Sequence, residues 1–135
     1  LITERTNTHR INLERLHTIA TEAAEQCERL DIPTIEEPTP LLHMLGAWPQ
    51  DRHLFAAIER TEARSITTPV SLHAARPGDG LLIGPEGGLS DTECQTLLNR
   101  SFIAPLSLGP LVLRADTAVA AGLALLGHGL RSAQD

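Results

Sequence analysis

A strand, a glycine-rich loop and a helix start follow one another between residues 81 and 93, and no other stretch limits the possible fold as strongly. Leu81–Ile83 is a short, continuous apolar run, which is typical of a strand buried on both faces of a sheet. Gly84 and Pro85 end this run, and the Gly87-Gly88 pair permits backbone angles that a Cβ atom would forbid. The stretch therefore predicts a buried strand whose chain turns sharply at its carboxyl end.

A helix is expected directly after this loop. Ser90 and Glu93 have the spacing of a capping box, which predicts a helix that begins at Asp91. In open α/β sheets, ligands bind between the end of a strand and the start of the next helix. The loop lacks the Gly-Lys-Ser/Thr ending of a phosphate-binding loop and the Gly-x-Gly-x-x-Gly spacing of a dinucleotide site, and Glu86 would repel a phosphate. A ligand with hydroxyls or a positive charge fits better, and a sharp turn without a ligand is the alternative.

Strands and helices alternate along the chain, which predicts an α/β fold with a largely parallel sheet. The clearest helix begins at Leu13, where apolar residues recur at three- and four-residue steps behind a cap at Asn12. The expected elements, in order, are a helix over 13–30, a short strand at 34–35, a helix from a cap at Thr39 to Leu45, a strand within 52–58, a loop over 59–65, a turn-rich region over 67–75, a helix over 91–100, a strand over 102–108, and a last helix from a cap at Asp116 or Thr117 to Leu130.

The last of these helices has no polar face. Ala, Val, Leu and a single Gly occupy every position from 118 to 126. Such a helix must be enclosed by other elements or by a partner subunit.

Composition limits the classes of function. With 135 residues, the chain suits one domain with a substantial core. Its net charge of −6 argues against free-standing nucleic-acid binding, which normally requires a basic surface. Basic residues are nonetheless concentrated near the start, at Arg5, His9, Arg10, Arg15 and His17, where a solvated face is the expected role.

The two cysteines, Cys27 and Cys94, are far apart and have no further Cys or His at ligand spacing. They predict neither a zinc site nor a disulfide, and two thiols suit a reducing cytoplasm. No apolar run reaches about 18 residues, so no membrane span is predicted.

Three segments, read together, resemble one family. They are residues 22–29 (Glu-Ala-Ala-Glu-Gln-Cys-Glu-Arg) followed by Pro33, residues 83–93 (Ile-Gly-Pro-Glu-Gly-Gly-Leu-Ser-Asp-Thr-Glu), and residues 107–118 (Ser-Leu-Gly-Pro-Leu-Val-Leu-Arg-Ala-Asp-Thr-Ala). Their order and spacing resemble the RsmE family, the 16S ribosomal RNA (uracil-N3) methyltransferases of the SPOUT class, which use S-adenosylmethionine. The resemblance covers nearly the whole chain.

The resemblance implies a fold, a substrate and partners. The sheet would carry helices on both faces, and the last helix would be tucked into a C-terminal trefoil knot. Residues 1–135 would form the S-adenosylmethionine-binding methyltransferase domain, and the family's N-terminal PUA-like RNA-binding domain and first strand and helix would lie upstream of Leu1. The family is homodimeric, with its site near the subunit interface, and acts on the small ribosomal subunit in the cytoplasm without a metal.

The resemblance also implies a cofactor site. The residues alone agree with it, because an apolar pocket with backbone donors and acceptors suits adenine. Glu86 would face either the ribose hydroxyls or the cationic sulfonium. The cofactor-binding residues expected by resemblance are Ala57, Ile58, Ile83, Gly84, Pro85, Glu86, Gly87, Gly88, Leu108, Gly109, Val112, Leu113 and Thr117.

Methyl transfer to uracil N3 sets further requirements. N3 must lose or share its proton, and the negative charge that develops on the ring favours a nearby cation. Arg114 is the candidate cation, with a salt-bridged residue at a helix start as the alternative. Asp116 is the candidate for orienting Arg114 or relaying the proton, with a plain helix cap as the alternative. Arg10 and Arg29 are candidate RNA contacts, and solvated surface positions are the alternative.

Two positions depart from the family pattern. Leu111 stands where the family usually has Arg, and Asp116 stands where it usually has Glu. The first change removes a cation beside the site, and the second shortens the reach of a carboxylate. The predicted function is S-adenosylmethionine-dependent methylation of uridine N3 in 16S ribosomal RNA, with weak or no activity from this chain alone. The alternatives are a module that binds S-adenosylmethionine or a nucleotide without catalysis, and a structural domain that dimerises through its last helix.

Overall fold

The computed structural model describes residues 1–7, 10–58, 75–109 and 111–132. The loop predicted over 59–65, and all but the last residue of the region predicted over 67–75, lie outside the described residues. The elements within them are α1 (Leu13–Gln26), α2 (Leu41–Ala47), β1 (Leu54–Ala57), β2 (Gly80–Ile83), α3 (Asp91–Leu98), β3 (Ile103–Leu106) and α4 (Ala115–Ser132).

The three strands form one parallel sheet in the order β2-β1-β3. In the central strand, Leu54 pairs with Gly80 on one side and Ile103 on the other, and Ala57 pairs with Ile83 and Leu106. A central parallel strand must be covered on both faces. Its sequence, Leu-Phe-Ala-Ala, is correspondingly apolar throughout.

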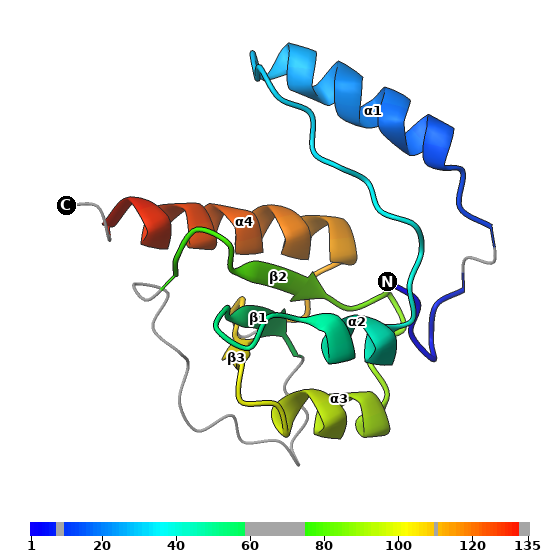
Figure 1. The fold of residues 1–135 in the computed structure, drawn as a ribbon, viewed down its shortest axis with the longest axis vertical. Helices are drawn as coiled ribbons and strands as arrows, with labels where there is room; N and C mark the ends of the chain where they lie inside the picture. The colour runs from blue at the N-terminus through cyan, green and yellow to red at the C-terminus, as the bar shows by residue number, and fades with distance from the viewer. Residues whose placement is uncertain (8–9, 59–74, 110, 133–135) are drawn as a thin grey trace.

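Helices cover both faces of this sheet (Figure 1). On one face, Leu54 and Ala56 of β1 pack in a core with residues of α2 and α3, including Leu45 and Leu97. On the other face, Phe55 of β1 packs in a second core with residues of β3 and with Leu126 of α4. The alternation of β1 side chains between two cores confirms the predicted α/β fold with a parallel sheet and helices on both faces.

Helix α1 ends earlier than predicted. Asn12 caps its start as expected, since Asn12 Oδ1 accepts from Arg15 N at 2.9 Å. The helix ends at Gln26 rather than at Leu30, because Glu28 takes a left-handed conformation with φ 56°. The amides of Glu28 and the next residue then donate to carbonyls one turn back, which is the Schellman pattern. Figure 1 shows α1 lying apart from the sheet.

The predictions around α2 need three corrections. Residues 34–35 form no strand; the nearby pairing is instead a parallel bridge between Ile2 and Pro40. Pro40, not Thr39, precedes α2, and the Thr39 hydroxyl donates to the Glu37 carbonyl instead. The helix continues through Gly46 to Ala47.

Helix α4 begins before its predicted caps. Ala118 N donates to the Arg114 carbonyl at 2.8 Å, so Asp116 and Thr117 lie within the first turn rather than capping it. The rest of the chain covers this apolar helix on one side only. Leu126 is buried against the sheet, whereas Leu123 is 57% exposed on the opposite side.

Candidate functional site

The loop after β2 folds as its sequence predicts. Gly88 has φ 71° and donates its N–H to the Pro85 carbonyl at 2.8 Å, which closes a tight turn. The capping box is present: Ser90 Oγ accepts from Glu93 N at 3.1 Å, and Glu93 Oε2 accepts from Ser90 N at 2.9 Å. The helix start therefore fixes one end of the loop.

A cavity of about 520 Å³ lies at the carboxyl ends of the three strands. The ends of β1 and β2 supply two walls, and the chain after β3 supplies the third. Parallel strands place their carboxyl ends at one edge, where α/β proteins bind ligands. The volume lies within the range of small-molecule sites. Its lining residues are Arg5, Ala57, Ile58, Ile83, Gly84, Pro85, Glu86, Gly87, Gly88, Leu89, Asp91, Cys94, Leu106, Ser107, Leu108, Gly109, Leu111, Val112, Leu113, Arg114, Ala115 and Ala118.

Every residue predicted to bind the cofactor lines this cavity except Thr117. Thr117 lies on α4, and its N–H donates to Asp116 Oδ1 at 2.8 Å. The structure thus brings together three segments that are 20 or more positions apart in the sequence. Whether they contact a cofactor stays a prediction.

The two predicted catalytic residues lie close together at the start of α4. Arg114 lines the cavity, whereas Asp116 does not. Arg114 Nε is 3.7 Å from Asp116 Oδ1, and their side chains are 88% and 74% exposed. The pair therefore forms a loose, solvated ion pair at the start of α4. This geometry agrees with Asp116 orienting Arg114, and the salt-bridge alternative describes the same contact.

The cavity has a further wall that the sequence did not reveal. Arg5 lines it, and Arg5 Nη1 donates to the Gly87 carbonyl at 3.0 Å. Arg5 is exposed, as expected for the basic N-terminal stretch, but it is also joined to the glycine loop. The two residues are 82 positions apart, and no motif spacing connects them. The other unpredicted lining residues lie within three positions of predicted ones along the chain, except Cys94, which is one helical turn into α3.

The predicted RNA contacts lie elsewhere. Arg29 follows α1, and its guanidinium donates to Asp31 Oδ2 at 2.9 Å. This hydrogen bond, together with the positive charge of Arg29, lowers the pKa of the Asp31 carboxyl below its ordinary value. Arg10 lies exposed just before α1. Neither arginine lines the cavity, and contact with RNA stays a prediction for both.

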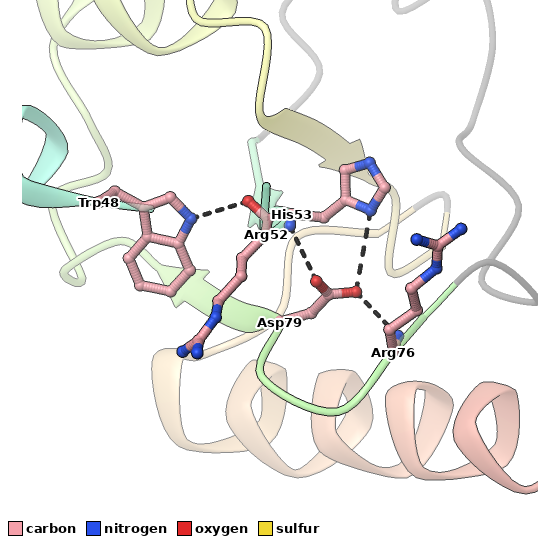
Figure 2. Close-up of polar contacts among 5 residues, drawn as sticks. All are labelled: Trp48, Arg52, His53, Arg76 and Asp79. Atoms are coloured by element: carbon pink, nitrogen blue, oxygen red, sulfur yellow. Dashed lines mark hydrogen bonds and ion pairs between the residues drawn. The ribbon is translucent and has the colours of Figure 1, made fainter. Parts of the chain in front are cut away.

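A separate polar cluster closes the opposite edge of the sheet (Figure 2). Asp79 accepts from His53 N and from Arg76 N, each at 2.8 Å, and its Oδ2 is 3.8 Å from His53 Nδ1. Trp48 Nε1 donates to the Arg52 carbonyl at 2.9 Å. These contacts fix the turns that lead into β1 and β2.

Other classes of site find no support in the part of the chain that the structure describes. There, no three His, Cys, Asp or Glu side chains gather in a way that could hold a metal ion. Cys27 is exposed and Cys94 buried, and both are free thiols. Among the described helices, none is both long and apolar enough to cross a membrane.

Comparison with known proteins identifies the family. Residues 1–127 match the RNA methyltransferase domain family. The chain belongs to this family. The match confirms the resemblance drawn from the three motifs, and it spans both the cavity and most of α4.

This chain has relatives in several bacteria. The chain is 32% identical over 124 residues to the ribosomal RNA small subunit methyltransferase E of Rickettsia conorii, covering 92% of this chain and 50% of that protein. It is 31% identical over 119 residues to the protein of the same name from Bacillus subtilis, covering 85% and 46%. The chain thus spans about half the length of these curated relatives.

A solved structure supports the same fold. The protein Lpg2936 of Legionella pneumophila, determined in complex with its bound cofactor SAM (S-adenosylmethionine), matches with a TM-score of 0.70 at 31% identity, covering 94% of this chain and 52% of that one. The expected α/β architecture of the SPOUT class is thereby confirmed. The trefoil knot stays a prediction.

Proposed function

We propose that this chain is the catalytic domain of an S-adenosylmethionine-dependent enzyme that methylates uridine N3 in 16S ribosomal RNA of the small subunit. The observation that carries the proposal is the cavity at the carboxyl edge of the sheet, which gathers three separated loops into one site. Membership of the RNA methyltransferase family, and relatives named as small-subunit methyltransferases, support it. The Legionella neighbour with bound SAM supports the choice of cofactor.

The cavity suits S-adenosylmethionine in chemistry as well as in size. Ile58, Leu106 and Leu108 give apolar walls for an adenine ring, and the loop from Gly84 to Gly88 presents backbone groups for its polar edge. The residues that would hold the cofactor are 57–58, 83–88, Leu108, Gly109, Val112 and Leu113. Thr117 does not line the cavity and would act only by supporting the start of α4. When bound, S-adenosylmethionine supplies the electrophilic methyl carbon.

The chain's own residues would then hold the uracil and manage its charge. Arg114 is placed at the rim, where its guanidinium would stabilise negative charge on the uracil ring. Asp116, 3.7 Å from Arg114, would orient that guanidinium or receive the N3 proton. Arg114→Ala should therefore lower turnover. Unchanged turnover and RNA affinity would show that Arg114 is only a surface residue.

The exposed side of α4 supports a homodimer. Val119, Leu123 and Leu125 are exposed on α4, and Leu111 and Val112 are more than 70% exposed beside the cavity. Apolar side chains gathered next to a site in this way mark an interaction surface. A second copy of the chain would cover them and would complete the enclosure that α4 lacks.

Arg10 and Arg29 would contact RNA, and the enzyme would work in the cytoplasm.

A binding module without catalysis is the second candidate. It is favoured by Leu111, which removes the cation expected there, and by the solvated, loosely held Arg114. Such a module would bind S-adenosylmethionine but would not transfer its methyl group.

The deciding experiment has two stages. Calorimetric titration of this chain with S-adenosylmethionine, with ATP and NAD as controls, should show saturable binding of S-adenosylmethionine alone. The natural full-length protein should then transfer a labelled methyl group to uridine N3 in small ribosomal subunits. Binding without transfer would favour the module. Absence of binding in both forms would remove the cofactor site from the proposal.

A further inference from the structure

The N-terminal segment from Ile2 to Arg5 is held by hydrogen bonds to three other parts of the chain, one of which is the glycine loop of the cavity. Ile2 N donates to the Thr39 carbonyl at 2.8 Å, and the Ile2 carbonyl accepts from Leu41 N at 2.9 Å. Glu4 N donates to Glu93 Oε1 at 2.9 Å, and Arg5 Nη1 donates to the Gly87 carbonyl. Each contact joins the segment to residues far along the chain. The segment is therefore held in place and forms part of the wall of the cavity.

Glu93 is the centre of this arrangement. Its side chain is only 5% exposed, and its two oxygens accept from two different segments: Oε1 from Glu4 N and Oε2 from Ser90 N. A buried carboxylate needs such partners, because burial without them is costly. The capping box alone uses one oxygen. The second oxygen therefore fixes the segment that carries Arg5 against the loop that carries Gly87.

The loop is shaped to receive this segment. A Cβ on Gly87 would lie 3.3 Å from Arg5 Cβ, which is tighter than ordinary packing. Glycine at this position therefore leaves room for Arg5.

Arg5 brings a positive charge to the cavity rim. Its hydrogen bond goes to a neutral carbonyl, so that bond leaves the guanidinium charge in place. Arg114, the other arginine of the lining, is instead held beside the Asp116 carboxylate. A guanidinium fixed at one end and exposed at the rim suits an incoming anionic group, such as a phosphate. Glu86, next to the Gly87 partner of Arg5, would repel that group, so the positive charge of Arg5 is what would allow a phosphate to approach the loop.

We propose that Arg5 is a substrate-facing residue of this site that contacts an anionic group of the RNA, and that Glu93 is the positioning residue that sets its place. This inference rests on the proposed function. The exposed position of Arg5 favours the RNA over the cofactor, because an RNA must approach from the open side of the cavity. The carboxylate of S-adenosylmethionine is the competing anion, and the experiment separates the two.

Arg5→Met and Arg5→Lys in the natural full-length protein test the role of Arg5, with Arg100→Met as a matched control on an exposed arginine that does not line the cavity. Three quantities are measured: the Kd for S-adenosylmethionine, kcat/KM for methyl transfer to small ribosomal subunits, and RNA affinity at two salt concentrations. Arg5→Met should lower RNA affinity and kcat/KM about tenfold and reduce the salt slope by about one, as expected for a lost phosphate contact. Its cofactor Kd should stay within about twofold of wild type. Arg5→Lys should retain part of the affinity.

A loss of cofactor affinity as large as the loss of kcat/KM would assign Arg5 to the cofactor and overturn the inference. Unchanged RNA affinity and turnover would also overturn it. If the wild-type protein transfers no methyl group, the proposed function fails, but the RNA affinities still decide the role of Arg5.

Glu93→Gln tests the positioning role, because an amide nitrogen cannot accept from a backbone N–H. The variant keeps one acceptor oxygen for two donors, so it should show part of the RNA defect of Arg5→Met, and adding it to Arg5→Met should cause little further loss. Independent, additive losses in RNA affinity would show that Glu93 only stabilises α3.

Discussion

The two edges of the sheet are built in different ways. At the amino edge, side chains make the contacts: Asp79 accepts from two backbone N–H groups (Figure 2). The Trp48 ring lies directly against Gly80. At the carboxyl edge, glycine-rich loops surround a cavity, and one hydrogen bond from Arg5 crosses to the loop. The amino edge is suited to rigidity, whereas the carboxyl edge leaves space for a ligand. Changes at the amino edge should therefore lower stability, and changes at the carboxyl edge should lower binding.

The largest loss of stability is expected from Gly80→Ala. A Cβ at this position would lie 2.5 Å from an atom of the Trp48 ring and 3.1 Å from Leu54 Cδ1, so a rigid ring must shift. Overpacking of this kind costs about 1–3 kcal/mol. Urea denaturation followed by circular dichroism measures the change. Gly46→Ala in α2 is the control, since its Cβ meets no atom within 4 Å and alanine should stabilise the helix by up to about 1 kcal/mol.

Gly80→Ala also tests whether the two edges are independent. The affinity for S-adenosylmethionine should not change, because Gly80 is at the start of β2 and the cavity is at its end. A parallel fall in affinity and stability would show that the sheet transmits the disturbance.

Asp79→Ala should have the next largest effect. It removes the acceptor of His53 N and of Arg76 N. Water can take the place of the lost acceptor less easily at the partly buried His53 N–H than at the exposed Arg76 N–H. An unsatisfied donor of this kind costs about 1–2 kcal/mol. Asp79→Asn is the matched control, because it keeps one acceptor oxygen and should lose about half as much. Equal losses in the two variants would mean that the charge of Asp79, through His53, matters more than its hydrogen bonds.

At the carboxyl edge, Gly109→Ala should affect cofactor binding more than stability. Gly109 has φ 121°, which an L-residue adopts at a cost of about 1–3 kcal/mol, while its Cβ would meet no atom within 4 Å. The exposed loop can relax into another conformation, so the stability loss should be smaller than at Gly80. The relaxed loop would no longer line the cavity correctly, and the Kd for S-adenosylmethionine should rise about tenfold. A normal Kd by calorimetry would remove this loop from the binding site.

The different success of sequence-based prediction at these sites has a physical reason. The capping box of Ser90 and Glu93 is a contact between residues three positions apart, so the sequence alone was enough to predict it. The apolar runs of β1 and β2 likewise follow from burial on both faces. Such features depend on neighbours along the chain, and the glycine loop of the cavity is one of them.

Features that depend on distant partners could not be predicted. Glu93 Oε1 accepts from Glu4, 89 positions away, and Arg5 donates to Gly87, 82 positions away. The end of α1 was missed for a different reason: the left-handed residue is Glu28, a residue type that rarely adopts that conformation. The wall that carries Arg5 therefore emerged only from the folded structure.

The smallest effect is expected for the ion pair of Arg29 and Asp31, which belongs to neither edge of the sheet. The hydrogen bond and charge of Arg29 lower the pKa of Asp31 below 3.8, and both side chains are more than half exposed. Because the folded-state pKa is lowered, the stabilisation exists above pH 3.8 and is lost as the pH falls through the lower folded-state value. Solvent screens such a pair, so Arg29→Met should leave the urea midpoint at neutral pH unchanged. An NMR titration should instead show the Asp31 pKa returning to about 3.8. A measurable fall in the urea midpoint would mean that α1 is held to the rest of the protein more firmly than its exposed surface indicates. The region around α1 would then contribute to stability in addition to the two edges of the sheet.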